Sequence, residues 1–404
     1  MADFGGSDLD AFRSEARAWL EANFPESLRK DPDAIVAVEQ GAAKAEGDVA
    51  LWKQRMGEKG WGTPTWPTAY GGGGLSRAEA RVLAEEMNAI GARNPIGGMG
   101  VIMFGPTLLE YGDETQKQTH IPPIVKGELR WCQGFSEPGA GSDLASLSTK
   151  AEDRGDHYLV SGSKIWTSGA HLADWCFCLV RTDPSKKHEG ISFLLIDMRT
   201  PGVETRPIRL INGTSPFCET FFTDVKVPKD QLWGPLNGGW TIAKRLLQHE
   251  RDNISAGLGG GNIGQATPLP TVVEAARDYV GMDADGRIAD ADLRRRITDH
   301  LMETRSFQLT VRRAADEAKS NQGPSAATSI MKYAGAKIAQ ERNELLIEAM
   351  GHQGLGWEGA GYSEAEITAF RTMLRSKANS IEGGTSEINL NVVSKRVLGL
   401  PDAK

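Results

Sequence analysis

The fold of this chain is decided by residues 131–175, which read WCQGFSEPGAGSDLASLSTKAEDRGDHYLVSGSKIWTSGAHLADW. Ser136–Asp143 is predicted to be a tight turn, because its glycines and proline disfavour both a helix and a central strand. Strand-like runs follow at Tyr158–Ser161, Lys164–Thr167 and Trp175–Arg181. Such a turn exposes backbone N–H groups and two hydroxyls, which suits a phosphorylated ligand with polar edges.

The same turn lacks the two common nucleotide-binding patterns, GxGxxG and GxxxxGK[ST]. A Rossmann or P-loop interpretation is therefore poor. On the residues of the turn alone, a plain β-turn between two surface strands explains the pattern equally well.

Composition excludes several classes of protein. The chain has 404 residues, enough for two or three domains, and its formal net charge of −7 argues against a nucleic-acid or polybasic membrane binder. No apolar run reaches the ~18 residues of a membrane-spanning helix, so no membrane insertion is expected. The N-terminus lacks the basic and apolar regions of an export signal. The four cysteines of the chain show no zinc or disulfide pattern. We expect a reduced, cytoplasmic protein.

One acidic stretch, Met282–Asp292, faintly resembles a calcium-binding loop. Asp283, Asp285 and Gly286 are suitable residue types, but their spacing and the terminal residue of the loop are wrong. No metal site is therefore predicted.

Hydrophobic periodicity divides the chain into three domains with boundaries at 1–128, 129–235 and 236–404. The first and third have helical spacing. The middle one has short strand-like runs without intervening helices, which indicates an antiparallel sheet or small barrel. Helices are expected in the first domain at Asp8–Ala22, Asp48–Lys59, Ser76–Ile90, Met99–Tyr111 and Glu114–Val125.

A carboxylate interrupts an apolar stripe on the helix predicted after Gly239. Glu250 shares one helix face with apolar residues spaced three and four apart, namely Trp240, Ala243, Leu247 and Ile254. Burial would raise the pKa of Glu250, as a general base working near neutral pH requires. The alternative is a structural Glu250 paired with Arg251 or with another helix.

Four separated motifs resemble the acyl-CoA dehydrogenases, a family of flavoproteins. In chain order they are WPTAYGGGG, SEPGAGSD followed by KIWTSGAHLADW, ETFFTDVKVP, and IEGGTSEINLNVVSKRVLGLP. The resemblance implies an α+β fold with an N-terminal α-helical domain, a middle antiparallel β domain and a C-terminal four-helix-bundle-like domain. It also implies FAD as cofactor and α,β-dehydrogenation of an acyl-CoA thioester to the trans-2-enoyl-CoA.

The resemblance also bears on the catalytic base. Most members carry it as the Glu of an xYEGTS motif, but here Gly383 occupies that position and Glu382 comes one residue too early. A subset that resembles isovaleryl- and long-chain acyl-CoA dehydrogenases carries the base in an ER pair on the helix after the β domain. Glu250 and Arg251 match that pair. Glu250 is thus predicted to take the α-proton while a hydride passes to flavin N5, with the Gly383 N–H and a ribityl hydroxyl polarising the thioester carbonyl.

Further contacts carry over by position. The predicted cofactor contacts are Phe135, Ser136, Ser142, Trp166, Ser168, Arg277, Glu348, Gly351, Thr385 and Glu387. The predicted substrate contacts are Ser142, Leu247, Arg251 and Gly384. The family's RxxFG motif is altered at Arg277–Gly281, and Glu348 replaces the Gln that usually approaches the pyrophosphate, so Glu348 must pair with a cation or turn away.

The resemblance implies an electron-transfer flavoprotein as partner, a place in fatty-acid β-oxidation, and a homo-oligomer built as a dimer of dimers, a homotetramer. Two alternatives remain open. One is an acyl-CoA oxidase or flavin monooxygenase of the same fold; the other is a non-catalytic subunit that completes the FAD site of a hetero-oligomer. Straight, branched, aromatic and steroid-like acyl chains all remain possible.

Overall fold

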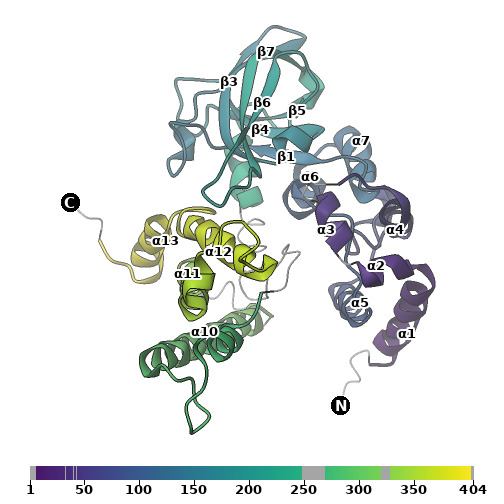
Figure 1. The fold of residues 1–404 in the computed structure, drawn as a ribbon. Coiled ribbons are helices and arrows are strands. Elements are labelled where there is room, and N and C mark those ends of the chain that lie inside the picture. The colour runs from purple at the N-terminus through teal and green to yellow at the C-terminus, as the bar shows by residue number, and fades with distance from the viewer. Residues whose placement is uncertain are drawn as a thin grey trace. The chain divides into compact units, whose positions relative to one another are not determined.

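The computed structural model describes residues 6–31, 33–39, 41, 43–247, 269–319 and 328–401. The chain forms two compact units (Figure 1). The first contains residues 1–208 and 215–249, and the second contains 209–214 and 250–404.

The first unit begins with helices around a tryptophan-rich core. The Trp19 ring packs on the rings of Trp52 and Trp61, with centroid distances of 5.8 and 4.8 Å. The helices are α1 (Gly6–Asn23), α2 (Glu26–Lys30), α3 (Asp33–Glu39), α4 (Gly47–Glu58), α5 (Arg77–Ala89), α6 (Gly105–Tyr111) and α7 (Glu114–Val125). The helices predicted here are present, although Gly100–Phe104 forms a wider turn of helix before α6.

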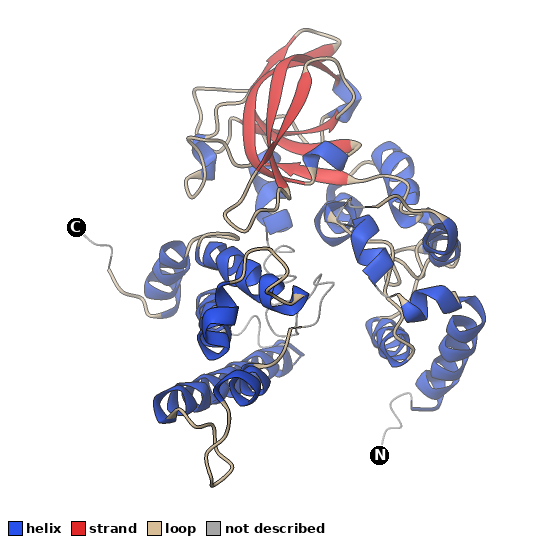
Figure 2. Ribbon diagram, in the orientation of Figure 1, coloured by secondary structure: helices blue, strands red, loops and turns tan. Residues whose placement is uncertain are grey.

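A seven-stranded sheet follows, drawn red in Figure 2. Its strands are β1 (Trp131–Gly134), β2 (Lys150–Asp153), β3 (His157–Ser168), β4 (Trp175–Arg181), β5 (Ile191–Asp197), β6 (Val203–Ile208) and β7 (Phe217–Pro228). Their order is β1-β4-β2-β3-β7-β6, and β5 pairs with β4. Most pairs are antiparallel, as expected, but β1 and β2 each pair with β4 in parallel. The longer of these two parallel pairs is β1 with β4. The chain between these two strands, which includes β2 and β3, supplies the crossover that a parallel pair needs.

Strands β4 and β5 are buried on both faces, which explains their continuous apolar sequences. One face of β4 contributes Phe177 and Leu179 to a core shared with α6 and α7. The other face contributes Cys176 and Cys178 to a second core. All four cysteines are buried free thiols.

The second unit is helical. Its described helices are α9 (Val272–Ala275), α10 (Ala291–Lys319), α11 (Thr328–Met350), α12 (Glu364–Ser376) and α13 (Ser386–Val392). A core cluster joins α10 and α11 through Leu293, Ile297, Leu345 and Leu346. In the described part of the chain, no helix is long and apolar enough to cross a membrane.

The acidic stretch before α10 is a closed loop. Asp283 Oδ1 accepts hydrogen bonds from the backbone N–H groups of Asp285 and Arg287. The Arg287 guanidinium forms ion pairs with the carboxylates of Asp283 and Asp285. Across the residues that the structure describes, no group of three His, Cys, Asp or Glu side chains could hold a metal ion.

Candidate flavin and thioester site

The glycine-rich turn after β1 is closed by its own backbone and attached to β3. Glu137 and Ala140 exchange two N–H···O bonds of 3.0 Å. Ile165 N donates to Ser136 O at 2.8 Å. Phe135 is buried, and its ring packs edge-on against Phe193 at 5.7 Å. The turn therefore holds a fixed position on the end of the sheet.

A buried ion pair lies directly beneath this turn. Lys164 Nζ is 2.8 Å from Glu137 Oε1 and donates to Phe135 O at 3.2 Å. The other donors to Glu137 are the backbone N–H groups of Ser148 and Thr149 and the Ser148 hydroxyl. Burial alone would raise the pKa of Glu137, but the Lys164 ammonium and these hydrogen bonds lower it to about 2. Neither Glu137 nor Lys164 is among the site residues predicted from the sequence.

Trp166 is held in an unusual conformation at a bulge in β3. Between Lys164 and Thr167, β3 has two residues where β7 has one, Glu219. Trp166 has φ of 60°, in the left-handed region that bulky residues avoid, and it is 52% exposed. Its ring meets Phe217 edge-on at 6.1 Å. The bulge thus leaves about half of the Trp166 surface exposed, as an aromatic contact to a planar ligand would require.

Two predicted hydroxyl contacts belong to the same region. Ser168 is half-buried at the end of β3. Ser142 is exposed in the turn, beside Asp143, whose carboxylate accepts from Lys187 Nζ at 2.9 Å. The structure thus places Phe135, Ser136, Ser142, Trp166 and Ser168 on the turn and on the strand bonded to it.

The helix that follows the sheet is described over residues 239–247. Ala243 is buried, and Trp240 and Leu247 pack half-buried against the same core. Those members of the predicted apolar stripe therefore do face the interior. Glu250 and Arg251, the predicted base and its neighbour, lie outside the described residues.

In the second unit, a double-glycine turn precedes α13. Gly383 and Gly384 have φ of 61° and 87°, which suits residues without a side chain. The Thr385 hydroxyl caps α13 by accepting from Ile388 N at 3.2 Å. Asn389 Nδ2 donates to the carbonyls of Gly384 and Thr385 at 3.2 and 2.9 Å. The turn is therefore fixed by its own helix.

Two acidic residues flank this turn. Glu382 Oε2 accepts from Arg375 Nη2 at 2.7 Å, so its carboxylate is directed to α12. Glu387 is exposed, and hydrogen bonds from its own backbone N–H and from Thr385 lower its pKa.

The predicted adenine-end residues lie elsewhere in the second unit. Glu348 on α11 forms a two-point ion pair with Arg296, at 2.5 and 2.7 Å. Arg277 is exposed, and Gly351 has φ of 58° at the end of α11. Near Arg277, Tyr279 donates to the buried Glu366 at 2.8 Å, and burial together with this carboxylate raises the pKa of Tyr279 to about 12.

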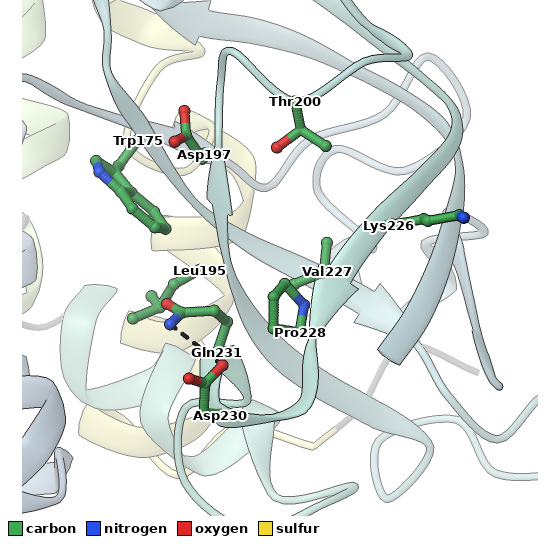
Figure 3. Close-up of a pocket in the computed structure, with 9 residues that line it drawn as sticks. All are labelled: Trp175, Leu195, Asp197, Thr200, Lys226, Val227, Pro228, Asp230 and Gln231. Atoms are coloured by element: carbon green, nitrogen blue, oxygen red, sulfur yellow. Dashed lines mark hydrogen bonds between the residues drawn. The ribbon is translucent and has the colours of Figure 1, made fainter. Parts of the chain in front are cut away.

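A surface hollow in the first unit involves none of these residues. It has a volume of 310 Å³ and lies beside Trp175 at the edge of the sheet (Figure 3). Its lining residues are Trp175, Leu195, Asp197, Thr200, Lys226, Val227, Pro228, Asp230 and Gln231.

Comparison with known proteins identifies the class. Residues 7–128, 132–225 and 237–398 match the N-terminal, middle and C-terminal domain models of acyl-CoA dehydrogenase. The α–β–α fold and these three matches define the class as the FAD-dependent acyl-CoA dehydrogenases. The chain belongs to the acyl-CoA dehydrogenase family, and FAD is its cofactor.

Several relatives match nearly the whole chain. Acyl-CoA dehydrogenase IpdE1 of Mycobacterium tuberculosis is 34% identical and covers 98% of both chains. Among solved structures, the Tcur3481-Tcur3483 steroid ACAD has a TM-score of 0.76 at 29% identity, with both chains fully covered. The ChsE4-ChsE5 complex from M. tuberculosis has a TM-score of 0.72 at 28% identity, also with both chains fully covered.

The first unit offers features that suit a flavin. A large aromatic side chain, Trp166, remains half exposed although its backbone is held in a costly conformation. The neighbouring turn presents exposed polar residues, including Ser142. These features fit the planar ring and the polar edges of FAD.

Proposed function

We propose that this protein dehydrogenates an acyl-CoA thioester with Glu250 as the base. The observation that carries this assignment is that the position at which the family usually carries its base has no carboxylate in this chain. Gly383 stands there without a side chain, and the adjacent Glu382 is engaged by Arg375 at 2.7 Å. We therefore assign the base to Glu250, which follows in the sequence the helix at residues 239–247 whose apolar side chains pack into the core.

The residues divide the reaction between them. Glu250 takes the proton from the α-carbon, and the β-hydrogen leaves as hydride, so that a trans double bond forms between the two carbons. When bound, FAD supplies the acceptor for that hydride. The backbone N–H of Gly383 donates to the thioester carbonyl and stabilises the negative charge that develops there. Leu247, Arg251, Ser142 and Gly384 line the thioester in this proposal.

The proposed contacts to the cofactor are the residues predicted from the sequence. Phe135, Ser136, Trp166 and Ser168 position the ring, and Ser142 lies at its phosphate or thioester side. The remaining proposed contacts, Arg277, Glu348, Gly351, Thr385 and Glu387, belong to the second unit. Arg296 neutralises Glu348, which allows a carboxylate to stand where the family usually has Gln.

The proposed redox partner is an electron-transfer flavoprotein. Of the acyl chains left open by the sequence, a steroid-like chain is favoured, because a structural neighbour is named a steroid ACAD.

A second candidate is a hetero-oligomer in which this chain works with a related subunit. The solved ChsE4-ChsE5 and Tcur3481-Tcur3483 neighbours are each named for two proteins. If the purified chain takes up FAD by itself and forms a homotetramer, this candidate is rejected. FAD uptake only with a second polypeptide would support it.

The function is tested by anaerobic mixing with a panel of acyl-CoA thioesters that spans straight, branched, aromatic and steroid-like chains. Bleaching of the flavin absorbance, followed by slow reoxidation in air, supports a dehydrogenase. Fast peroxide formation would instead support an oxidase. Failure of every thioester to bleach an FAD-loaded preparation would overturn the proposal.

A further inference from the structure

We propose that the buried Glu137–Lys164 ion pair is a positioning device for the flavin. It fixes the turn at Phe135 and Ser136 relative to the bulge at Trp166. This inference rests on the cofactor contacts of the proposed function and adds two residues that act through them.

Three hydrogen bonds connect the chain at Phe135–Glu137 to β3. Lys164 Nζ bonds both Glu137 Oε1, at 2.8 Å, and Phe135 O, at 3.2 Å. The next residue along β3, Ile165, donates its backbone N–H to Ser136 O at 2.8 Å. Three successive residues of the turn are therefore bonded to two successive residues of the strand. No contact of this set involves solvent-exposed charge, because Lys164 and Glu137 are 0% and 6% exposed.

The free energy of the buried pair favours a role in geometry over a role in stability. Burial of two opposite charges costs about as much as their attraction returns, so an ion pair of this kind stabilises a fold little compared with apolar side chains of the same size. An unpaired partner, however, costs several kcal/mol. The donors from Ser148 and Thr149 occupy the remaining acceptor sites of Glu137, so the carboxylate is satisfied in this one arrangement. A fixed geometry is what such a pair provides.

The backbone is strained at Trp166, two residues after Lys164. A left-handed conformation costs a bulky residue such as Trp166 about 1–2 kcal/mol. Such a conformation persists only where the surrounding structure enforces it. The anchored Lys164 side chain precedes the bulge, and the Lys164–Thr220 and Thr167–Cys218 pairs with β7 flank it. The ion pair therefore holds one end of the segment that presents Trp166.

The experiment separates positioning from stability. Lys164→Met and Glu137→Gln each leave one buried partner unmatched and should lower Tm. The double variant K164M/E137Q removes both charges while Gln keeps an acceptor for Thr149 N, and should recover most of that Tm. All three should bind FAD about tenfold more weakly and shift the visible flavin spectrum, because the contacts at Phe135 and Trp166 lose their fixed spacing.

A matched control is available on the neighbouring strand. Lys150 and Glu152 form an exposed pair at 2.7 Å, with side chains 57% and 40% exposed. The double variant K150M/E152Q makes the same chemical change at the surface of β2. It should leave the FAD affinity and the flavin spectrum unchanged.

FAD affinity and the flavin spectrum decide the test without any measurement of turnover. Native FAD affinity and a native flavin spectrum in a folded double variant K164M/E137Q overturn the proposal, whatever its Tm. If that variant fails to fold, Glu137→Asp is the alternative, because it keeps the charge but shortens the reach by one methylene. Native FAD affinity and spectrum in folded Glu137→Asp would equally overturn the proposal. Because FAD binding is measured without substrate, loss of the Glu250 assignment would not affect this result.

Discussion

Arg375 Nη2 donates to Glu382 Oε2 at 2.7 Å and thereby directs the carboxylate next to Gly383 toward α12. By the resemblance described above, most members of the family carry the base at the position that Gly383 occupies here, directly before Gly384-Thr385-Ser386. The ion pair explains why Glu382, although adjacent, is not proposed for that role. The proposed base is instead Glu250.

Glu382→Gln should leave the rate of flavin reduction within about twofold of the native rate. The pair with Arg375 is 31% and 40% exposed, so its loss should lower the free energy of unfolding by less than about 1 kcal/mol. Stopped-flow reduction and urea denaturation measure the two quantities. A large loss of reduction rate with native FAD content would assign the base to Glu382 instead.

Arg296→Ala should raise the Kd for FAD about tenfold. Without Arg296, the Glu348 carboxylate is left unneutralised beside the proposed pyrophosphate contact. The double variant R296A/E348Q should restore native affinity, because the repelling charge is gone. Titration of apoprotein with FAD measures both. A double variant that binds no better than Arg296→Ala would show that Glu348 does not approach the cofactor.

Trp166→Gly should weaken FAD binding about tenfold with little change in stability. Release of the left-handed backbone, worth about 1–2 kcal/mol, offsets the conformational entropy that Gly loses on folding. The loss of an aromatic contact accounts for the weaker binding. Calorimetric Tm and FAD titration check the two halves. A steep fall in Tm with native FAD affinity would make Trp166 a purely structural residue.

The Glu137 carboxylate should make the free energy of unfolding depend on pH in the acid range. Its pKa is about 2 in the folded protein, below the ordinary value of 4.5. The charged carboxylate, with Lys164 beside it, is therefore more favourable in the folded protein than the protonated form above pH ~4.5, and this contribution to stability is lost as the pH falls toward ~2. The difference in unfolding free energy between the native protein and Glu137→Gln should shrink over this range. A difference that stays constant with pH would contradict the assignment.

Much of this fold is accessible from local sequence. The helices α5 and α7 begin at capping boxes, Ser76 with Glu79 and Asp113 with Gln116, which a spacing argument can find. The strands β4 and β5 are continuous apolar runs. The division into helical, β and helical parts follows from the same periodicities.

The features that organise the site are less accessible. Glu137 and Lys164 are separated by 27 residues, and only the folded sheet brings a turn carboxylate to a strand lysine. The left-handed Trp166 likewise depends on the bulge in the β3–β7 pairing. The sequence does require a partner for Glu348, but the identity of Arg296 depends on how α10 packs on α11.

The most direct test of the account is Glu250→Gln, which keeps the shape of the side chain and removes its basicity. Native protein, Glu250→Gln and the control Glu382→Gln are loaded with FAD and mixed anaerobically with a thioester that bleaches the native flavin. The assignment of the base to Glu250 predicts that Glu250→Gln reduces its flavin about a thousandfold more slowly, with unchanged FAD content, while Glu382→Gln behaves as native. Native-rate bleaching by Glu250→Gln would contradict it.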